Sequence, residues 1–322
     1  KMFDVKKIIE EITSEKQIKN LSFAGVGGSL ACFYAAYYYV QREAKNITTS
    51  YTSANEFVHD TPACIGENSI VVIASRGGNT AETVEAGRVA KSKGATVIGL
   101  THEAQDTGIH EVSDYTIVFE DGEGIPFEVG KSAYILKIAY ETLYQVEGTG
   151  QYEAMVEAMN KMNELVPAAQ KAIVPEAIQF SIQYKDNPVI YTMGSGTAWS
   201  AAQQETICIL MEMQWINSAV IHTGEYFHGP FEITDPDTAF LLLKSTGKTK
   251  ALDERAIRFL DQYNHHHTVI DLEKYGSHEL GEVSEYYDYD FHTALLDVFN
   301  HLLADMRDHP LSKRKYMWKY KY

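Results

Sequence analysis

The largely apolar stretch MEMQWINSAVIHTGEYFHGPFE, residues 211–232, contains carboxylates and imidazoles that could exchange protons. Four of them are of interest here: Glu212, His222, Glu225 and His228. A carboxylate removed from water is a good general base, and an imidazole exchanges protons near neutral pH. These residue types predict acid–base chemistry rather than a simple core segment.

Glu212 falls in the last turn of a helix predicted over residues 197–213. Two interpretations are open for it: a desolvated carboxylate that acts as a base, or an exposed residue at a helix end. The apolar neighbours that favour the first are Ile209, Leu210, Met211, Met213 and Trp215.

His228 comes just before Gly229 and Pro230, where regular structure breaks, so its imidazole is well placed to meet a ligand. The spacing of His222, Glu225 and His228 would suit a metal only on a straight helix. A strand-like pattern leads into this segment, so we expect no metal here.

Short β-branched runs alternate with helical patterns along the whole chain, which predicts parallel sheets covered by helices. The helical stretches include 28–44 and 80–93. The predicted strands are residues 21–25, 69–75, 95–100, 115–119, 188–193, 217–222, 238–245 and 267–272.

The two halves of the chain align with each other. GVGGS at 25–29 matches GSGTA at 194–198, which indicates a duplicated domain. We expect one domain over 1–150, connecting helices over 151–184 and a second domain over 185–322.

Two glycine-rich loops of the first half follow predicted strands, at Gly25–Ser29 and Ser75–Thr83. Glycine lets backbone N–H groups approach an anion, and the following helix dipole favours negative charge. The alternative is a pair of tight strand–helix turns. Polar or charged side chains are added by Ser75, Arg76, Asn79 and Thr80.

The first loop lacks the pattern of a dinucleotide site, because Leu30 stands where the third glycine belongs. The next strand region, ITTSYTS, also ends without the acid that holds a ribose. We therefore expect no redox cofactor.

The loops GVGGS and SRGGNTAET resemble those of the sugar isomerase (SIS) domain family, which binds phosphosugars. The resemblance implies two tandem SIS domains, each a flavodoxin-like, doubly wound α/β sheet. The family pattern Ser-x-Ser-Gly-x-Thr is kept at Ser75, Gly78 and Thr80, with Gly77 at the middle serine. It implies phosphate contacts from Ser75, Arg76, Gly77, Gly78, Asn79 and Thr80.

GEYFHGP at 224–230 is similar to a segment of the isomerase half of glucosamine-6-phosphate synthase, in which a histidine opens the sugar ring. There, a glutamate sixteen residues upstream moves a proton between C1 and C2. MEMQW and HPLSKRKYMWKYKY resemble the fructosamine-6-phosphate deglycase branch more closely. The resemblance implies Glu212 as base and His228 as acid, with further substrate contacts from Gly27, Gly28, Ser29, Ser132, Glu225, Lys315 and Tyr316.

A deglycase of this branch cleaves a glycated amino acid 6-phosphate to glucose 6-phosphate and the free amino acid. Its active site is shared between subunits, so the resemblance implies at least a homodimer. The alternatives are a ketose/aldose phosphosugar isomerase, a non-catalytic phosphosugar-binding regulator and a structural protein without a ligand.

The net charge of −16 over 322 residues argues against nucleic-acid binding. The basic tail 312–322, with aromatic residues between its charges, suggests either RNA or, as we favour, a segment lying against an acidic body. Three widely spaced cysteines and the absence of a long apolar run favour a cytoplasmic protein with no membrane association.

Overall fold

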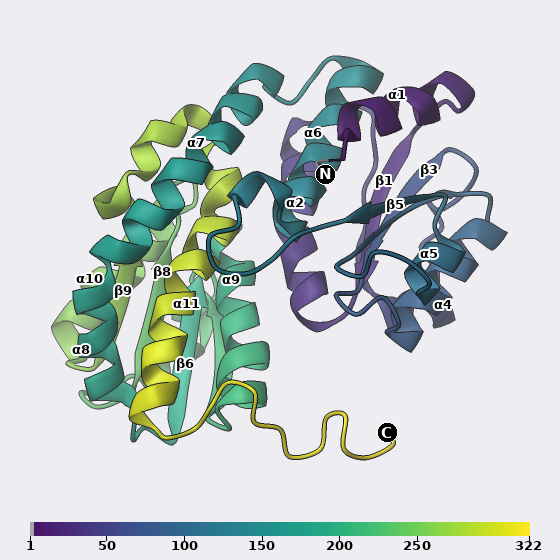
Figure 1. The fold of residues 1–322 in the computed structure, drawn as a ribbon. Helices are drawn as coiled ribbons and strands as arrows, with labels where there is room; N and C mark the ends of the chain where they lie inside the picture. The colour runs from purple at the N-terminus through teal and green to yellow at the C-terminus, as the bar shows by residue number, and fades with distance from the viewer. Residues whose placement is uncertain (1–2) are drawn as a thin grey trace. The chain divides into compact units, whose positions relative to one another are not determined.

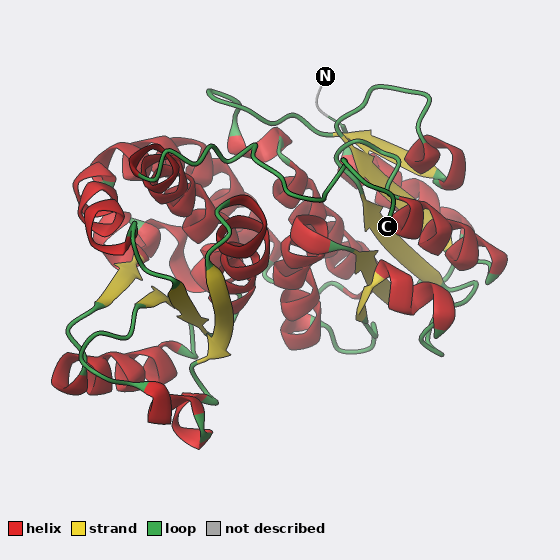
Figure 2. Cartoon of the chain, turned by 90° about the horizontal axis from the view of Figure 1, so that it is seen from below, coloured by secondary structure: helices red, strands yellow, loops and turns green. Residues whose placement is uncertain are grey.

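The computed structural model describes residues 3–322. The chain divides into two compact units, one ending at Asn163 and the other beginning at Glu164. Each unit has its own all-parallel sheet flanked by helices, and Figure 2 shows the strands gathered in these two sheets. The boundary falls inside helix α7, Tyr152–Ala172.

The first unit contains a five-stranded sheet of order β2-β1-β3-β4-β5, the order of flavodoxin-like doubly wound folds. Every residue of β1, β3 and β4 is buried, because helices cover both faces of a parallel sheet. The strands are β1 Asn20–Gly25, β2 Tyr51–Ser53, β3 Ser69–Ala74, β4 Thr96–Thr101 and β5 Tyr115–Val118.

Helices α1, α2 and α6 pack together on one face of this sheet, and α3, α4 and α5 cover the other (Figure 1). The second layer closes a core that includes Val71, Ile73, Val84, Val97 and Ile109. The helices are α1 Val5–Glu15, α2 Gly27–Glu43, α3 Ala54–His59, α4 Ala81–Ser92, α5 Gly108–Val112 and α6 Lys131–Glu147.

The second unit contains a four-stranded sheet of order β7-β6-β8-β9. Helices α8, α9 and α11 pack together, while α10 contributes Ala256 and Leu260 to a separate core with Phe240 and Leu242. These elements are α8 Val174–Tyr184, β6 Val189–Gly194, α9 Ala198–Gln204, β7 Asn217–His222, β8 Phe240–Lys244, α10 Lys250–Tyr263, β9 His267–Asp271 and α11 Asp288–Met306.

Each predicted strand is present to within two residues at either end, and the helical segment expected over 151–184 forms α7 and α8. The helix expected over 197–213 differs from prediction. It is α-helical only to Gln204 and continues as a π-helix over Glu205–Met213. The 3₁₀ segments are Phe127–Val129, Tyr226–His228, Pro230–Ile233, Leu272–Tyr275 and Ser277–Tyr287.

After α11 the chain continues to Tyr322 without helix or strand (Figure 2). Within residues 3–322, no helix combines the length and the apolar character needed to cross a bilayer.

A buried carboxyl group ties together the ends of three strands in the second unit. Asp253 of α10 accepts hydrogen bonds from the Ser195 hydroxyl after β6 at 3.0 Å and the Thr223 hydroxyl after β7 at 2.6 Å. It also accepts one from the Ser245 N–H after β8 at 2.8 Å. Burial raises the pKa of Asp253, while these donors oppose the rise.

Replacing Asp253 should therefore loosen all three loops at once. We expect Asp253→Ala to lower the free energy of unfolding by roughly 2–4 kcal/mol, because it removes the buried acceptor that three donors share. The neighbouring Glu254→Ala removes an exposed carboxylate paired with Lys244 at 3.5 Å and should cost less than about 1 kcal/mol. Chemical denaturation of both variants measures the difference, and equal losses would contradict the role of Asp253.

Candidate active site

The glycine-rich loop over residues 75–80 leads from the carboxyl end of β3 into α4. Ser75 is buried, and its hydroxyl lies 2.9 Å from that of Thr80. The Thr80 N–H also points at the Ser75 hydroxyl oxygen, at 3.4 Å. Two hydroxyls thus meet at the N-terminus of a twelve-residue helix, where the helix dipole favours an anion.

Gly78 is the position in this loop that requires glycine. Its φ is +72°, and a Cβ there would lie 2.4 Å from the Thr107 hydroxyl oxygen. Gly77 stands at the middle serine of the family pattern, and a Cβ there would have no other atom within 4 Å. The loop therefore has room for a side chain at Gly77 and none at Gly78.

Arg76, which we expected to offer charge to an anion, is paired with Asp121. Its Nε donates to one carboxylate oxygen at 2.8 Å and its Nη2 to the other at 3.1 Å. The hydrogen bond from Arg76 lowers the pKa of Asp121. Because both side chains are exposed, a ligand would have to compete with Asp121 for the guanidinium.

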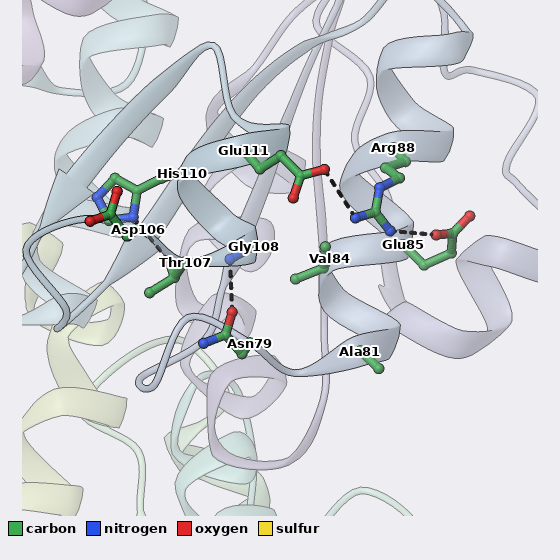
Figure 3. Close-up of a pocket in the computed structure, with 10 residues that line it drawn as sticks. All are labelled: Asn79, Ala81, Val84, Glu85, Arg88, Asp106, Thr107, Gly108, His110 and Glu111. Carbon is green, nitrogen blue, oxygen red and sulfur yellow. Dashed lines mark hydrogen bonds and ion pairs between the residues drawn. The ribbon is translucent and has the colours of Figure 1, made fainter.

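Asn79 supports the neighbouring helix, since its side-chain oxygen accepts the Gly108 N–H at 2.8 Å (Figure 3). Beside it lies an open groove of about 910 Å³, in which Arg88 is paired with Glu85 and Glu111. Ser75 and Thr80 do not line this groove. It is therefore distinct from the hydroxyl pair.

The loop GVGGS connects β1 to α2 and meets the start of α6. Gly27 has a φ of +54°, and Gly28 follows it in the first turn of α2. The Lys131 ammonium donates to the Ser29 hydroxyl at 3.2 Å. Ser132 is the next residue of α6. The structure thus places a cation beside the Ser29 hydroxyl at this loop.

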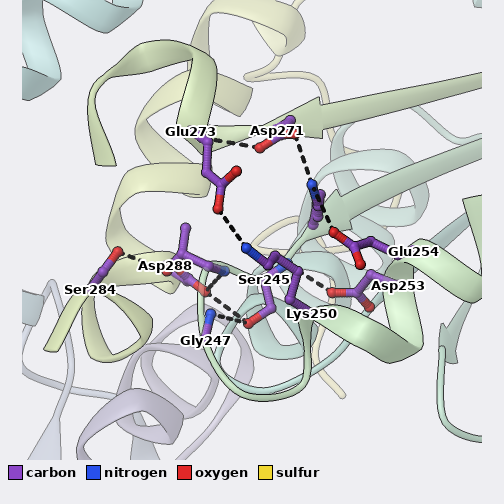
Figure 4. Close-up of polar contacts among 11 residues, drawn as sticks. Ser245, Gly247, Lys250, Asp253, Glu254, Asp271, Glu273, Ser284 and Asp288 are labelled. Atoms are coloured by element: carbon purple, nitrogen blue, oxygen red, sulfur yellow. Dashed lines mark hydrogen bonds and ion pairs between the residues drawn. The ribbon is translucent and has the colours of Figure 1, made fainter. Parts of the chain in front are cut away.

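In the second unit, the loop after β8 is filled by a carboxyl group of the chain itself. Asp288 accepts hydrogen bonds from the Thr246 N–H at 2.8 Å and the Thr246 hydroxyl at 2.5 Å. It also accepts one from the Ser245 hydroxyl at 3.1 Å (Figure 4). Burial raises the pKa of Asp288 to about 8. The neighbouring Lys248 N–H donates to Glu285 at 3.3 Å. Donors of this loop are thus already engaged.

Glu212 lies near the end of the π-helix, and π-helical turns occur frequently at functional sites. Its side chain is 22% exposed and is paired with Arg314, whose Nη2 lies 2.8 Å from Oε1. The surroundings of Glu212 are therefore not purely apolar, and the side chain is neither fully desolvated nor fully exposed. Met211 and Trp215 turn outward to solvent, and the carboxylate instead meets a cation from the tail.

His228 and Glu225 lie on the exposed turn that follows β7. The His228 N–H donates to the Glu225 carbonyl at 2.9 Å, and Gly229, with a φ of +140°, ends the turn. No hydrogen bond or ion pair joins the side chains of Glu212 and His228, both of which are fully described. A single chain thus does not join these two residues.

The other tail residues expected at the site are exposed. The Lys315 ammonium lies 4.8 Å from the centre of the Trp215 ring, and the Tyr316 ring is near that of Tyr320. Arg314 was not predicted as a site residue. The sequence of a basic run does not indicate which of its side chains is buried, and here it is Arg314. Asp121, Lys131 and Asp288 were missed for a related reason: their partners are remote in sequence.

Comparison with known proteins places this architecture in a family. Residues 16–134 match the SIS domain model. The chain is 36% identical to fructosamine deglycase FrlB of Bacillus subtilis (strain 168), over 95% of its own length and 94% of that protein. The chain therefore belongs to the SIS domain family.

Two further similar proteins bear on the branch of the family to which the chain belongs. Fructoselysine 6-phosphate deglycase of Escherichia coli (strain K12) is 24% identical over 83% of this chain and 77% of its own. A crystal structure of a candidate phosphosugar isomerase from Salmonella typhimurium LT2 is 46% identical, with a TM-score of 0.96 over 99% of this chain and 96% of that one. Within the SIS family, the chain lies in the fructosamine deglycase branch, as its motifs predicted.

The backbone of the 75–80 loop can be tested with two matched glycine substitutions. We expect Gly78→Ala to lower the free energy of unfolding by roughly 2 kcal/mol or more, because a left-handed residue gains a Cβ that meets Thr107. It should also weaken calorimetric binding of glucose 6-phosphate. Gly77→Ala, in open space, should change either quantity little. Equal effects of the two substitutions would show that this backbone geometry does not matter.

Proposed function

We propose that the protein is a fructosamine-6-phosphate deglycase, which converts a glycated amino acid 6-phosphate and water to glucose 6-phosphate and the free amino acid. The observation that carries this proposal is the similarity to fructosamine deglycase FrlB over nearly the full length of both chains. The segments that contain Glu212 and His228 supply the acid–base groups that such a reaction requires.

The reaction moves a proton between adjacent carbons and then breaks a C–N bond. His228 helps to open the sugar ring, which exposes the C2 carbonyl. Glu212 removes a proton from C1, giving an enaminol, and a proton returned to C2 gives the imine. Water adds to the imine carbon, the amine leaves and glucose 6-phosphate remains. No electrons are gained or lost overall, so no redox partner is required.

We assign the substrate phosphate to the 75–80 loop of the first unit, with Gly27, Gly28, Ser29 and Ser132 as further contacts. The hydroxyl pair of Ser75 and Thr80 at the start of α4 supports this assignment. The loop after β8 is a poor alternative, because the Asp288 carboxyl group engages its donors.

We infer two tandem SIS domains, over 1–150 and 185–322, joined by the helices of 151–184. The order of the second sheet supports this, since β7-β6-β8-β9 repeats the order of the first four strands of the first sheet. We also propose a dimer in which the exposed turn with Glu225 and His228 completes the partner subunit's site.

A phosphosugar isomerase is the second candidate, favoured by the similarity to the Salmonella structure. It would use the same proton transfer by Glu212 without cleavage of a C–N bond.

The test is a panel of 6-phosphorylated fructosamines, glycated on either the α-amino group or the lysine side chain, assayed for glucose 6-phosphate. We expect release with at least one member of the panel. Glu212→Gln should lower turnover by about 100-fold or more, because it removes a general base, while binding of glucose 6-phosphate persists. Glu232→Gln, the same change at an exposed residue to which we assign no role, should keep full activity.

Interconversion of ketose and aldose phosphates without release of amine would favour the isomerase instead. Full activity in Glu212→Gln would remove that residue as the base.

A further inference from the structure

Arg314 differs from the other basic residues of the tail in being buried. Its side chain is only 8% exposed, whereas Lys313, Lys315 and Lys319 are exposed. The Arg314 Nη1 donates to the carbonyls of Leu311 at 2.7 Å and Lys313 at 2.9 Å. Backbone carbonyls of neighbouring residues thus hold the guanidinium in place.

The residues just before the tail are also held against the segment that follows the π-helix. The Gln214 side-chain amide donates to the His309 carbonyl at 2.8 Å, and the Arg307 Nη2 donates to the Gln214 carbonyl at 3.3 Å. The Trp215 and His309 rings meet edge-to-face, 4.6 Å apart. These contacts begin two residues after Glu212. They therefore hold the residues that lead into the tail close to that carboxylate.

The pair between Arg314 and Glu212 therefore has fixed geometry on both sides. Exposed ion pairs of this chain, such as Arg88 with Glu85, join side chains that are each 48% exposed and contribute little. Here the corresponding exposures are 8% and 22%. Removing one partner of such a pair leaves the other partly buried without its counter-charge.

The contact also leaves room for chemistry. The Arg314 Nη2 touches Oε1 of Glu212, so the guanidinium orients the carboxylate through one oxygen. We assign the proton transfer to the other oxygen, Oε2. Arginine stays protonated at every pH at which a protein is folded, so it does not itself exchange a proton in the reaction.

We propose that Arg314 is a positioning residue for the deglycase reaction, which holds Glu212 in the orientation that takes the C1 proton. The proposal rests on the proposed function, and it deepens it by giving the basic tail a role at the base. A misplacement of a reacting group by about 1 Å costs on the order of 100-fold in rate. The loss should therefore appear in kcat rather than in substrate binding.

The experiment compares Arg314→Gln, Arg314→Lys and Lys313→Ala with the wild-type chain, using a fructosamine 6-phosphate that the wild type cleaves. We expect Arg314→Gln to lower kcat roughly 10- to 100-fold while KM changes less than about threefold. Arg314→Lys should recover part of the loss, because it keeps the charge without the planar fork. Lys313→Ala removes a neighbouring cation that lies over Trp215 and should behave as wild type.

Kinetics of Arg314→Gln within twofold of wild type would overturn the proposal. An increase in kcat would also overturn it, since the pair would then be a contact that blocks the base. A wild-type chain that cleaves no fructosamine 6-phosphate would instead refute the proposed function. Only the wild-type measurement decides that question, so the two failures can be distinguished.

The pair can be examined without substrate, through a double-mutant cycle of thermal unfolding. Glu212→Gln, Arg314→Gln and the double variant should show a favourable coupling between the two side chains. If the two substitutions are additive, Arg314 does not hold Glu212 in solution and the proposal fails.

Discussion

Parallel pairing of the strands determines where polar chemistry is possible in each unit. The carboxyl ends of such strands share one edge of the sheet, and ligands of open α/β sheets bind beyond that edge. In the first unit this edge carries Ser75 after β3 and the Gly25–Ser29 loop after β1. In the second unit it brings Ser195, Thr223 and Ser245 onto a single carboxyl group, that of Asp253.

The two edges differ in the charge of the side chain that the helix after the last strand places beside the loops. Helix α6 follows the last strand of the first sheet and opens with Lys131, whose ammonium reaches Ser29. Helix α11 follows the last strand of the second sheet and opens with Asp288, whose carboxyl group takes hydrogen bonds from Ser245 and Thr246. The loops of the first unit thus have a cation beside them, whereas the loop after β8 in the second unit is hydrogen-bonded to a carboxyl group of the chain. This difference supports the proposed binding of the phosphate by the first unit.

Much of the architecture was predictable from local sequence. Buried β-branched runs gave the strands, and the loop and GEYFHGP motifs gave the family, because both signals depend on neighbouring residues. The pairing of Arg76 with Asp121 and of Glu212 with Arg314 was not predictable, since each joins residues 45 or more positions apart. The π-helix over Glu205–Met213 was missed because its residues suit an α-helix equally well.

Proton transfer between C1 and C2 is the central step of the proposed reaction. It can be followed with a fructosamine 6-phosphate that carries two deuterium atoms at C1, by NMR of the released sugar. The mechanism predicts glucose 6-phosphate that retains one deuterium at C1, since Glu212 removes the other. Release of fructose 6-phosphate with both deuterium atoms still at C1 would show direct displacement of the amine by water, and would contradict it.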